Sequence, residues 1–273
     1  MAEEITPERA IELSAGEYGE ASAKFFANYA VPLFFGRVDE AGEIVLRNGT
    51  AFFIKSPKTT FGVTADHVIK ACLNAPPCGL FPVNFGNSPA ALVELGDIED
   101  RIIDRSERRD IATFRISDDE LSKLGVTTAS HWPPVAPELK KGVGFCGFPA
   151  DKRARQIVSV NLDASGTRQV VVSFMPFPVR GIASSISEYQ FTFVFNRETV
   201  VKTQGFQTAQ DDLHIGGMSG GPAFSKIWTP GGVEYWSPAG VVTDGCMNPE
   251  LGEGRLIAAR IDECLAATGT ISG

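Results

Sequence analysis

The sequence predicts an all-β protein made of short antiparallel strands. After residue 29, short runs rich in Val, Ile, Phe and Thr alternate with turn residues, which is typical of strands joined by hairpins. These runs lie at 31–35, 43–46, 50–54, 60–64, 111–116, 156–160, 169–174, 190–195 and 240–243. Many short strands separated by Gly and Pro favour a barrel or a sandwich over alternating β-α-β units.

The two ends of the chain and one central segment break this β pattern. Thr6 followed by Pro7 is typical of a helix start, and residues 7–28, rich in Ala and Glu, predict one or two helices. Asp262 could cap a short helix that reaches residue 267. The proline-rich segment that begins at His131 predicts a linker, because prolines sustain neither a helix nor a central strand. We therefore expect a helical extension at 1–30, a first β unit at 31–130, a linker at 131–140, and a second β unit with a terminal helix at 141–273.

Composition and charge narrow the classes of partner. The 273 residues are 43% hydrophobic and 21% charged, which is ordinary for a globular protein. The formal net charge of -8 disfavours nucleic acid, since proteins that bind it usually carry a basic face. No run approaches the roughly 18 apolar residues of a membrane-spanning helix, and the acidic amino terminus lacks the parts of a secretion signal. We expect neither nucleic acid nor a membrane as a partner.

The cysteine pattern predicts reduced thiols and a cytoplasmic protein. The five cysteines are scattered and odd in number. A disulfide between Cys72 and Cys78, which are close in sequence, is an alternative that the sequence leaves open. There is no CxxC pair and the histidines lie far apart, so we expect no metal. A GxGxxG string at Gly142–Gly147 has a β pattern after it where dinucleotide binding needs a helix. We therefore expect no cofactor.

Three local sequences carry the residue types of nucleophilic catalysis. His67 follows a β run, Asp110 opens an apolar strand, and Ser219 lies in a glycine-rich loop before a strand. A serine hydroxyl needs a neighbouring base, and histidine suits that task because its pKa lies near neutral pH. A carboxylate on the other ring nitrogen fixes the histidine tautomer. Each motif taken singly is more often structural, but all three occur once, each at a strand boundary.

The glycines around Ser219 have a chemical purpose of their own. The amides of Gly217 and Ser219 could both point at an oxyanion, in backbone conformations that side chains would hinder. These two amides are our candidate oxyanion hole.

The three motifs resemble the signature blocks of trypsin-like (chymotrypsin-fold) serine peptidases. The matching strings are Thr64-Ala65-x-His67, Asp110-Ile111-Ala112 and Gly217-x-Ser219-Gly220-Gly221-Pro222. The Asp-Ile-Ala form and the lack of paired cysteines look most like the bacterial HtrA-type branch, here without a PDZ domain. The resemblance runs over residues 31–265 and implies two antiparallel six-stranded β-barrels with the active site between them.

That resemblance implies a serine endopeptidase that works through an acyl-enzyme on a polypeptide substrate. His67 and Asp110 would come from the first barrel and Ser219 from the second. Met218 stands where digestive members carry the aspartate that pairs with a freshly cut amino terminus, so we predict no zymogen step.

The resemblance also points to substrate-binding residues. Leu213, six residues before the serine, stands at the usual floor of the specificity pocket, and Leu256 would intrude on it. Both predict a small or medium apolar side chain before the scissile bond, while His214 leaves an acidic one open. Gly245 and Thr243 lie on the strand that lines the substrate cleft, and we expect Thr243 to donate a hydrogen bond to Asp110.

Two alternative hypotheses for the function rest on the same residues. One is a catalytically silent member of the fold that uses the cleft to bind a peptide or a protein. The other is a peptidase that serves one dedicated partner, with the amino-terminal helices as the docking site. Labelling by a fluorophosphonate separates the silent protein from either peptidase.

Overall fold

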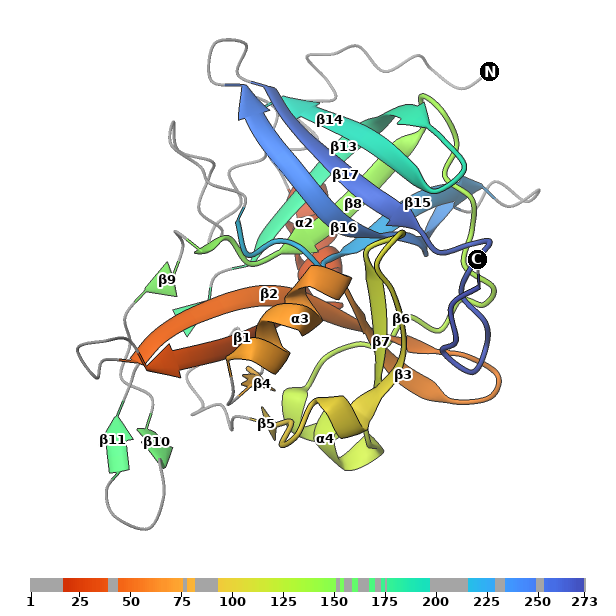
Figure 1. Cartoon of the computed structure of the whole chain (residues 1–273). Helices are drawn as coiled ribbons and strands as arrows, with labels where there is room; N and C mark the ends of the chain where they lie inside the picture. The colour runs from red at the N-terminus through yellow and green to blue at the C-terminus, as the bar shows by residue number, and fades with distance from the viewer. Residues whose placement is uncertain are drawn as a thin grey trace, which may run out of the picture.

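The structure, a computed structural model, contains two β units and few short helices (Figure 1). It describes residues 17–38, 44–75, 78–81, 93–150, 153–154, 159–161, 167–169, 173–174, 176–196, 216–228, 234–248 and 253–272. Within these residues no helix is long and apolar enough to cross a membrane.

The first unit is a curled antiparallel sheet of seven strands in the order β5-β4-β1-β2-β3-β7-β6. Its buried face encloses one apolar cluster around Phe53 and Phe114, which helix α3 covers with Ile69. The elements are β1 (Ala30–Val38), β2 (Ile44–Lys55), β3 (Thr60–Thr64), α3 (Asp66–Asn74), β4 (Cys78–Leu80), β5 (Val93–Glu94), the 3-10 helix η1 (Glu99–Arg101), β6 (Ile102–Ser106), β7 (Ile111–Arg115) and α4 (Asp118–Leu124).

The second unit is a closed barrel of six strands in the order β13-β14-β17-β16-β15-β8. Phenylalanines dominate its core, with Phe145, Phe191 and Phe193 almost fully buried. The strands are β8 (Gly142–Gly147), β13 (Phe177–Ile186), β14 (Gln190–Asn196), β15 (Pro222–Trp228), β16 (Glu234–Asn248) and β17 (Glu253–Arg260). The GxGxxG string is thus the barrel strand β8 and has no helix directly after it.

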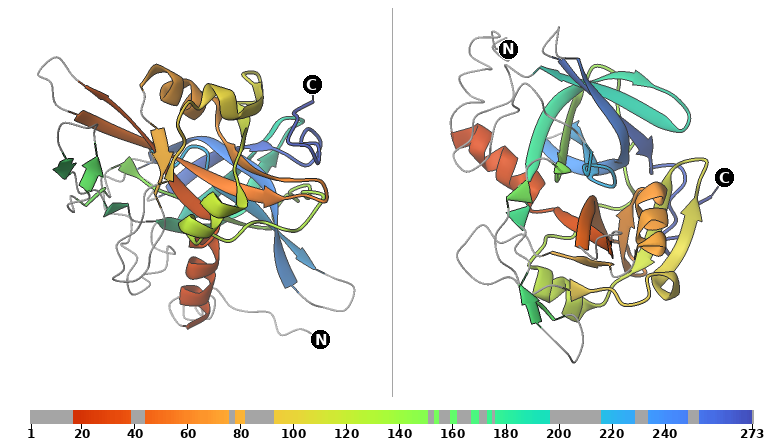
Figure 2. Two further views of the ribbon diagram at one scale, coloured as in Figure 1. Left: turned by 90° about the horizontal axis from the view of Figure 1, so that it is seen from below. Right: turned by 60° about the vertical axis from the view of Figure 1, so that its left-hand side comes forward.

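A third apolar cluster joins the two units. It contains Phe52 from the first unit, Phe148 and Phe224 from the second, and Phe26 from helix α2 (Glu17–Ala27). The ring of Phe26 is fully buried and packs edge-on against Trp236. Helix α2 contacts β8 and β13 on the side of the barrel (Figure 2). The described part of the helical extension is therefore an integral part of the core.

The prediction of an all-β fold with two chymotrypsin-like antiparallel barrels is confirmed, although the first unit is a curled seven-stranded half-barrel. Two runs predicted as strands, 156–160 and 169–174, are described only in part, and their described residues belong to short strands. These are β10 (Ser159–Asn161), β11 (Thr167–Gln169) and β12 (Ser173–Phe174), with β9 (Arg153–Ala154) paired to β12.

The short helix predicted at the carboxyl end is absent from the described residues 253–272, which form turns after β17. Arg260 explains the difference, because its guanidinium binds Asp262 at 2.6 Å and so occupies the carboxylate that was expected to cap the helix. The segment instead packs along the first unit, where Thr113 Oγ1 donates to the carbonyl of Gly269 at 2.6 Å.

Candidate active site

His67 lies in the first turn of α3, directly after strand β3. The N–H groups of this turn lack partners within the helix, and Ala65 at the N-cap offers no side-chain acceptor. The carboxylate of Asp110 takes that role, because its Oδ1 accepts the backbone N–H of His67 at 2.9 Å. A carboxylate at a helix amino terminus is also favoured by the helix dipole.

The same carboxylate binds the ring of His67. Asp110 Oδ2 lies 2.7 Å from His67 Nδ1, and the two side chains are 30% and 50% exposed. A carboxylate accepts only, so the proton sits on Nδ1 and leaves Nε2 as the acceptor nitrogen. The hydrogen bond to Asp110 raises the pKa of His67 above its usual value, while partial burial opposes that rise.

Asp110 occupies this place because of an unusual backbone conformation. It ends the turn between β6 and β7 with a φ of 53°, a left-handed value that is uncommon outside glycine. Two neighbours hold the turn against the second barrel, since the guanidinium groups of Arg108 and Arg109 lie 4.5 and 4.6 Å from the ring centroid of Tyr189. Arg108 also donates to the Tyr189 hydroxyl at 2.7 Å.

A buried acid stands directly before His67. Asp66 is 1% exposed, and its two oxygens contact Arg105 Nε at 2.6 Å and Lys70 Nζ at 3.3 Å. Lys70 in turn pairs with Glu107 at 2.8 Å. This ionic cluster ties the start of α3 to the β6–β7 hairpin and so fixes the element that carries His67 relative to the one that carries Asp110.

Ser219 lies in the loop before β15, and the carbonyls of this loop are held by hydrogen bonds. Gly216 accepts from the Ala150 amide at 2.7 Å, and Met218 accepts from the Gly221 amide at 3.1 Å. Gly217 accepts from Thr50 Oγ1 at 3.0 Å. Among the hydrogen bonds of the described residues, the amides of Gly217 and Ser219 donate none.

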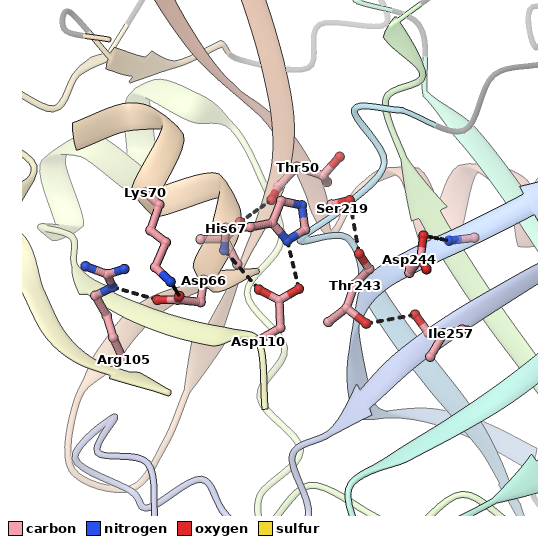
Figure 3. A network of polar contacts seen from close by, with 12 residues as sticks. Thr50, Asp66, His67, Lys70, Arg105, Asp110, Ser219, Thr243, Asp244 and Ile257 are labelled. Carbon is pink, nitrogen blue, oxygen red and sulfur yellow. Dashed lines mark hydrogen bonds and ion pairs between the residues drawn. The ribbon is translucent and has the colours of Figure 1, made fainter. Parts of the chain in front are cut away.

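The serine loop is seated against the strand that leads to His67. The carbonyl of Ser219 accepts the Thr50 amide at 2.8 Å, and the carbonyl of Thr50 accepts the hydroxyl of Thr64 at 2.7 Å. Gly220 has no room for a side chain, because a Cβ would collide with the Thr50 carbonyl and the Thr64 hydroxyl. Figure 3 shows the His67 ring between Asp110 and this loop. The three predicted catalytic side chains are thus gathered at the junction of the two units.

The serine hydroxyl itself has a different partner. Ser219 Oγ donates to the carbonyl of Thr243 at 3.4 Å (Figure 3), and the structure records no hydrogen bond between it and His67. The distance is at the long end of hydrogen bonding, so this contact is weak. This hydrogen bond must break before a base can accept the hydroxyl proton.

The residues predicted to bind substrate have mixed outcomes. The hydroxyl of Thr243 donates to the carbonyl of Ile257 at 3.4 Å and not to Asp110. Leu256 is 1% exposed inside the second barrel, so its side chain fills the core and does not line an open pocket. Gly245 lies on β16 beside Thr243, and its amide donates to Asp244 Oδ1. Leu213 and His214 lie outside the described residues.

Sequence reasoning missed the residues that hold this site together. Asp66 and Lys70 are four apart on a helix, which is a recognisable ion-pair spacing, but nothing in the sequence indicates that Asp66 is buried. Thr50 and Tyr189 act through partners far away along the chain and carry no local signal. The described cysteines are all free, and no group of His, Cys, Asp and Glu in the described part of the chain could hold a metal ion.

Comparison with known proteins finds likeness in structure but not in sequence. No protein-family model and no curated protein matches the chain at a significant level. Among solved structures, a thermostable serine protease, AL20, from an extremophilic microorganism is 14% identical with a TM-score of 0.46, over 86% of this chain and 91% of its own.

Two further solved structures are similar to the same degree. The serine protease domain of the Sesbania mosaic virus polyprotein is 17% identical with a TM-score of 0.41, over 84% of this chain and 87% of its own. The protease Anisep from Arthrobacter nicotinovorans is 13% identical with a TM-score of 0.42, over 85% of this chain and 90% of its own. Identities this low carry no information on activity, so function rests on the geometry of the site.

Proposed function

We propose that this protein is a serine endopeptidase in which Ser219 is the nucleophile, His67 the general base and then acid, and Asp110 the group that orients His67. The observation that carries the proposal is the 2.7 Å contact between His67 Nδ1 and Asp110 Oδ2, made beside a serine loop that is bonded to the neighbouring strand. This arrangement leaves Nε2 as a base of the right tautomer at the same junction as the Ser219 hydroxyl.

The reaction then follows two balanced steps. Ser219 Oγ bonds to the carbonyl carbon of the substrate while its proton passes to His67 Nε2. Collapse of the tetrahedral species breaks the C–N bond, and His67 returns the proton to the leaving amine. Water attacks the resulting ester with His67 again as base, which releases the acid and restores Ser219. Before the attack, the Ser219 hydroxyl must exchange its hydrogen bond to the Thr243 carbonyl for one to His67, a change compatible with the loose geometry of unliganded sites.

The orientation of the loop carbonyls supports the amides of Gly217 and Ser219 as the oxyanion hole. In a trans peptide the N–H points opposite to the preceding carbonyl. The carbonyls of Gly216 and Met218 are bonded to Ala150 and Gly221, so the amides of Gly217 and Ser219 point away from those partners. Two such donors are what a developing oxyanion needs.

Met218 supports an oxyanion hole that forms without proteolytic activation. Its side chain is 1% exposed and packs in the core of the second barrel. Burial of a methionine therefore anchors the loop at the position where an ion pair would otherwise be required. We expect this chain to be active without proteolytic cleavage.

The substrate and the branch of the family remain proposals that rest on sequence. A small apolar residue before the scissile bond follows from Leu213, and the HtrA-type relationship follows from Asp110-Ile111-Ala112. On the described helix α2, a dedicated protein partner could bind the polar face, because the apolar face is buried against β8 and β13.

Fluorophosphonate labelling tests the proposal. The wild-type protein should be labelled in proportion to its concentration, and Ser219→Ala and His67→Ala should not be labelled although both remain folded. A folded wild-type protein that resists labelling would favour the silent peptide-binding module. The contact between Ser219 Oγ and Thr243 is the one observation on the side of that alternative.

A further inference from the structure

Thr50, on strand β2 of the first unit, contacts the serine loop of the second unit at several points. Its side chain is fully buried. We propose that Thr50 is a positioning residue that holds the Ser219 loop in its oxyanion-binding conformation from across the junction of the two units. The inference rests on the proposed peptidase function and identifies what keeps that site assembled.

The hydroxyl of Thr50 bridges two segments of the second unit. It donates to the carbonyl of Gly217 at 3.0 Å and accepts the amide of Phe148 at 3.1 Å. One hydroxyl can do both, since it carries one donor and two acceptor sites. It therefore links the serine loop to the segment after β8, which also supplies the Ala150 amide that holds Gly216.

The backbone of Thr50 makes the matching contacts. Its N–H donates to the carbonyl of Ser219 at 2.8 Å, and its carbonyl accepts the hydroxyl of Thr64 at 2.7 Å. Thr64 ends the strand that precedes His67. A single residue thus touches the carbonyls on both sides of Met218 and the strand that leads to the base.

Asn48, two residues earlier on the same strand, reinforces the hydroxyl. Its Nδ2 donates to the carbonyl of Phe148 at 2.7 Å and lies 3.4 Å from that of Gly217. Its Oδ1 is buried and has no hydrogen-bond partner among the described residues, which costs free energy. The side-chain amide of Asn48 therefore satisfies the two carbonyls at the expense of its own oxygen. Its contact with Gly217 is the longer one and is weak by itself.

Gly217 is the residue that needs such support. Its φ of 91° is one of many conformations open to glycine, so its two flanking peptides can rotate unless both are bonded. Ala150 fixes the peptide before it and Thr50 the peptide after it. Without the Thr50 hydroxyl, the carbonyl of Gly217 keeps the 3.4 Å contact with Asn48. The peptide that joins Gly217 to Met218 is then held less firmly, and the loop that carries the Ser219 amide loses one of its anchors.

Thr50→Val tests the proposal, because valine keeps the shape of threonine and has a methyl group in place of the hydroxyl. We expect the kcat for a peptide substrate and the rate constant of fluorophosphonate inactivation to fall about tenfold to hundredfold, less than the loss of an oxyanion donor itself. KM should change little, because the oxyanion contact is made mainly in the transition state. Thr50→Ser, which keeps the hydroxyl, should restore both rates to within about threefold of wild type.

Thr113→Val is the matched control. Thr113 is also a fully buried threonine of the first unit, but its hydroxyl bonds to Gly269, away from the loop. It should lose stability without losing reactivity towards the phosphonate. Should Thr50→Val fail to fold, Thr50→Cys, whose thiol donates only weakly, takes its place.

The outcomes separate the two claims. A wild-type protein that does not react with the phosphonate overturns the peptidase proposal and this inference with it. A reactive wild type together with a folded Thr50→Val, or its Cys substitute, of equal reactivity overturns the role of Thr50 and leaves the peptidase intact. An equal loss in Thr113→Val and Thr50→Val would also overturn the specific role, because it would indicate a general loss of packing.

Discussion

The two sides of the candidate site are held by different kinds of interaction. On the side of His67, ion pairs fix the residues: Asp110 binds the ring of His67, and Asp66 binds Arg105 and Lys70. On the side of Ser219, uncharged hydrogen bonds to backbone carbonyls hold the loop, made by the amide of Ala150 and by Thr50. The base is thus positioned electrostatically, and the nucleophile by neutral contacts.

This difference has consequences for how each side responds to conditions. Charged contacts at a partly exposed site depend on protonation and on salt. Hydrogen bonds between buried neutral groups change little with pH or with salt concentration. We therefore expect pH to act on the base while the oxyanion amides stay in place. Variants on the His67 side test this difference, because they leave the contacts of the Ser219 side intact.

Removal of the Asp110 charge should have the largest effect. In Asp110→Asn the amide can present a donor to His67 Nδ1, which favours the wrong tautomer and removes support for the imidazolium. We expect kcat to fall about ten-thousand-fold, measured with a chromogenic peptide substrate. Ser219→Ala supplies the background rate, and a loss below about tenfold in Asp110→Asn would contradict the assigned role.

Removal of the buried Asp66 charge should lower stability strongly. Asp66→Ala leaves Arg105 and Lys70 without their shared partner, and loss of one member of a buried ion pair costs roughly 3–5 kcal/mol. Arg105 is 25% exposed and Lys70 is 42% exposed, so we expect a smaller loss of about 2–3 kcal/mol. Urea denaturation should show a lower midpoint at unchanged slope.

The exposed Asp244 offers a control for this variant. Asp244→Ala removes a carboxylate near the same histidine but without a buried partner, and its midpoint should stay close to that of wild type. Equal midpoints for Asp66→Ala and wild type would show that the ionic cluster contributes nothing to the fold.

The residues that meet at the candidate site could be predicted from the sequence because their signals are local. His67, Asp110 and Ser219 each follow or open a strand within a short motif, and the structure gathers them at one junction. The glycines around Ser219 were interpretable for the same reason, since a positive φ at Gly217 is a property of one residue and its neighbours.

What could not be predicted depends on partners distant in the sequence. Thr50 contacts Phe148 and Gly217, which lie 98 and 167 positions away. One miss has a local cause: the helix expected after Asp262 does not form, because Arg260, two residues earlier, binds the carboxylate that was expected to cap it. Leu256 was placed at a pocket, but the pleat of β17 turns it into the barrel core. Local patterns do not state which face of a strand is buried against what.

The pH dependence of His67 should move activity and stability in opposite directions. The hydrogen bond to Asp110 raises the pKa of His67 in the folded state. Activity needs neutral His67, so it should rise with increasing pH, with an apparent pKa above about 6.5. Protonated His67 stabilises the fold below about pH 6.5, and that contribution is lost as pH rises through the folded pKa. Rate profiles and melting curves from pH 5 to 9 measure both.

Two variants separate the contributions to that pKa. Asp110→Asn should lower the apparent pKa of His67. It should also abolish the fall in melting temperature that accompanies the rise in pH. Asp244→Asn should lower the pKa less, because Asp244 acts on His67 only through its charge. An unchanged profile in Asp110→Asn would mean that the observed titration belongs to another group.

The smallest effect should come from the contact that holds the Asp110 turn against the second barrel. Tyr189→Leu removes the ring between Arg108 and Arg109, and loss of an exposed cation–π contact should lower the melting temperature by about 2 °C. Tyr189→Phe keeps the ring and loses only the hydroxyl that accepts from Arg108, so it should stay closer to wild type. If the turn also positions Asp110, Tyr189→Leu alone should lower the pKa of His67 in the rate profile. Identical profiles for the Leu and Phe variants would show that the aromatic contact supports the fold without reaching the base.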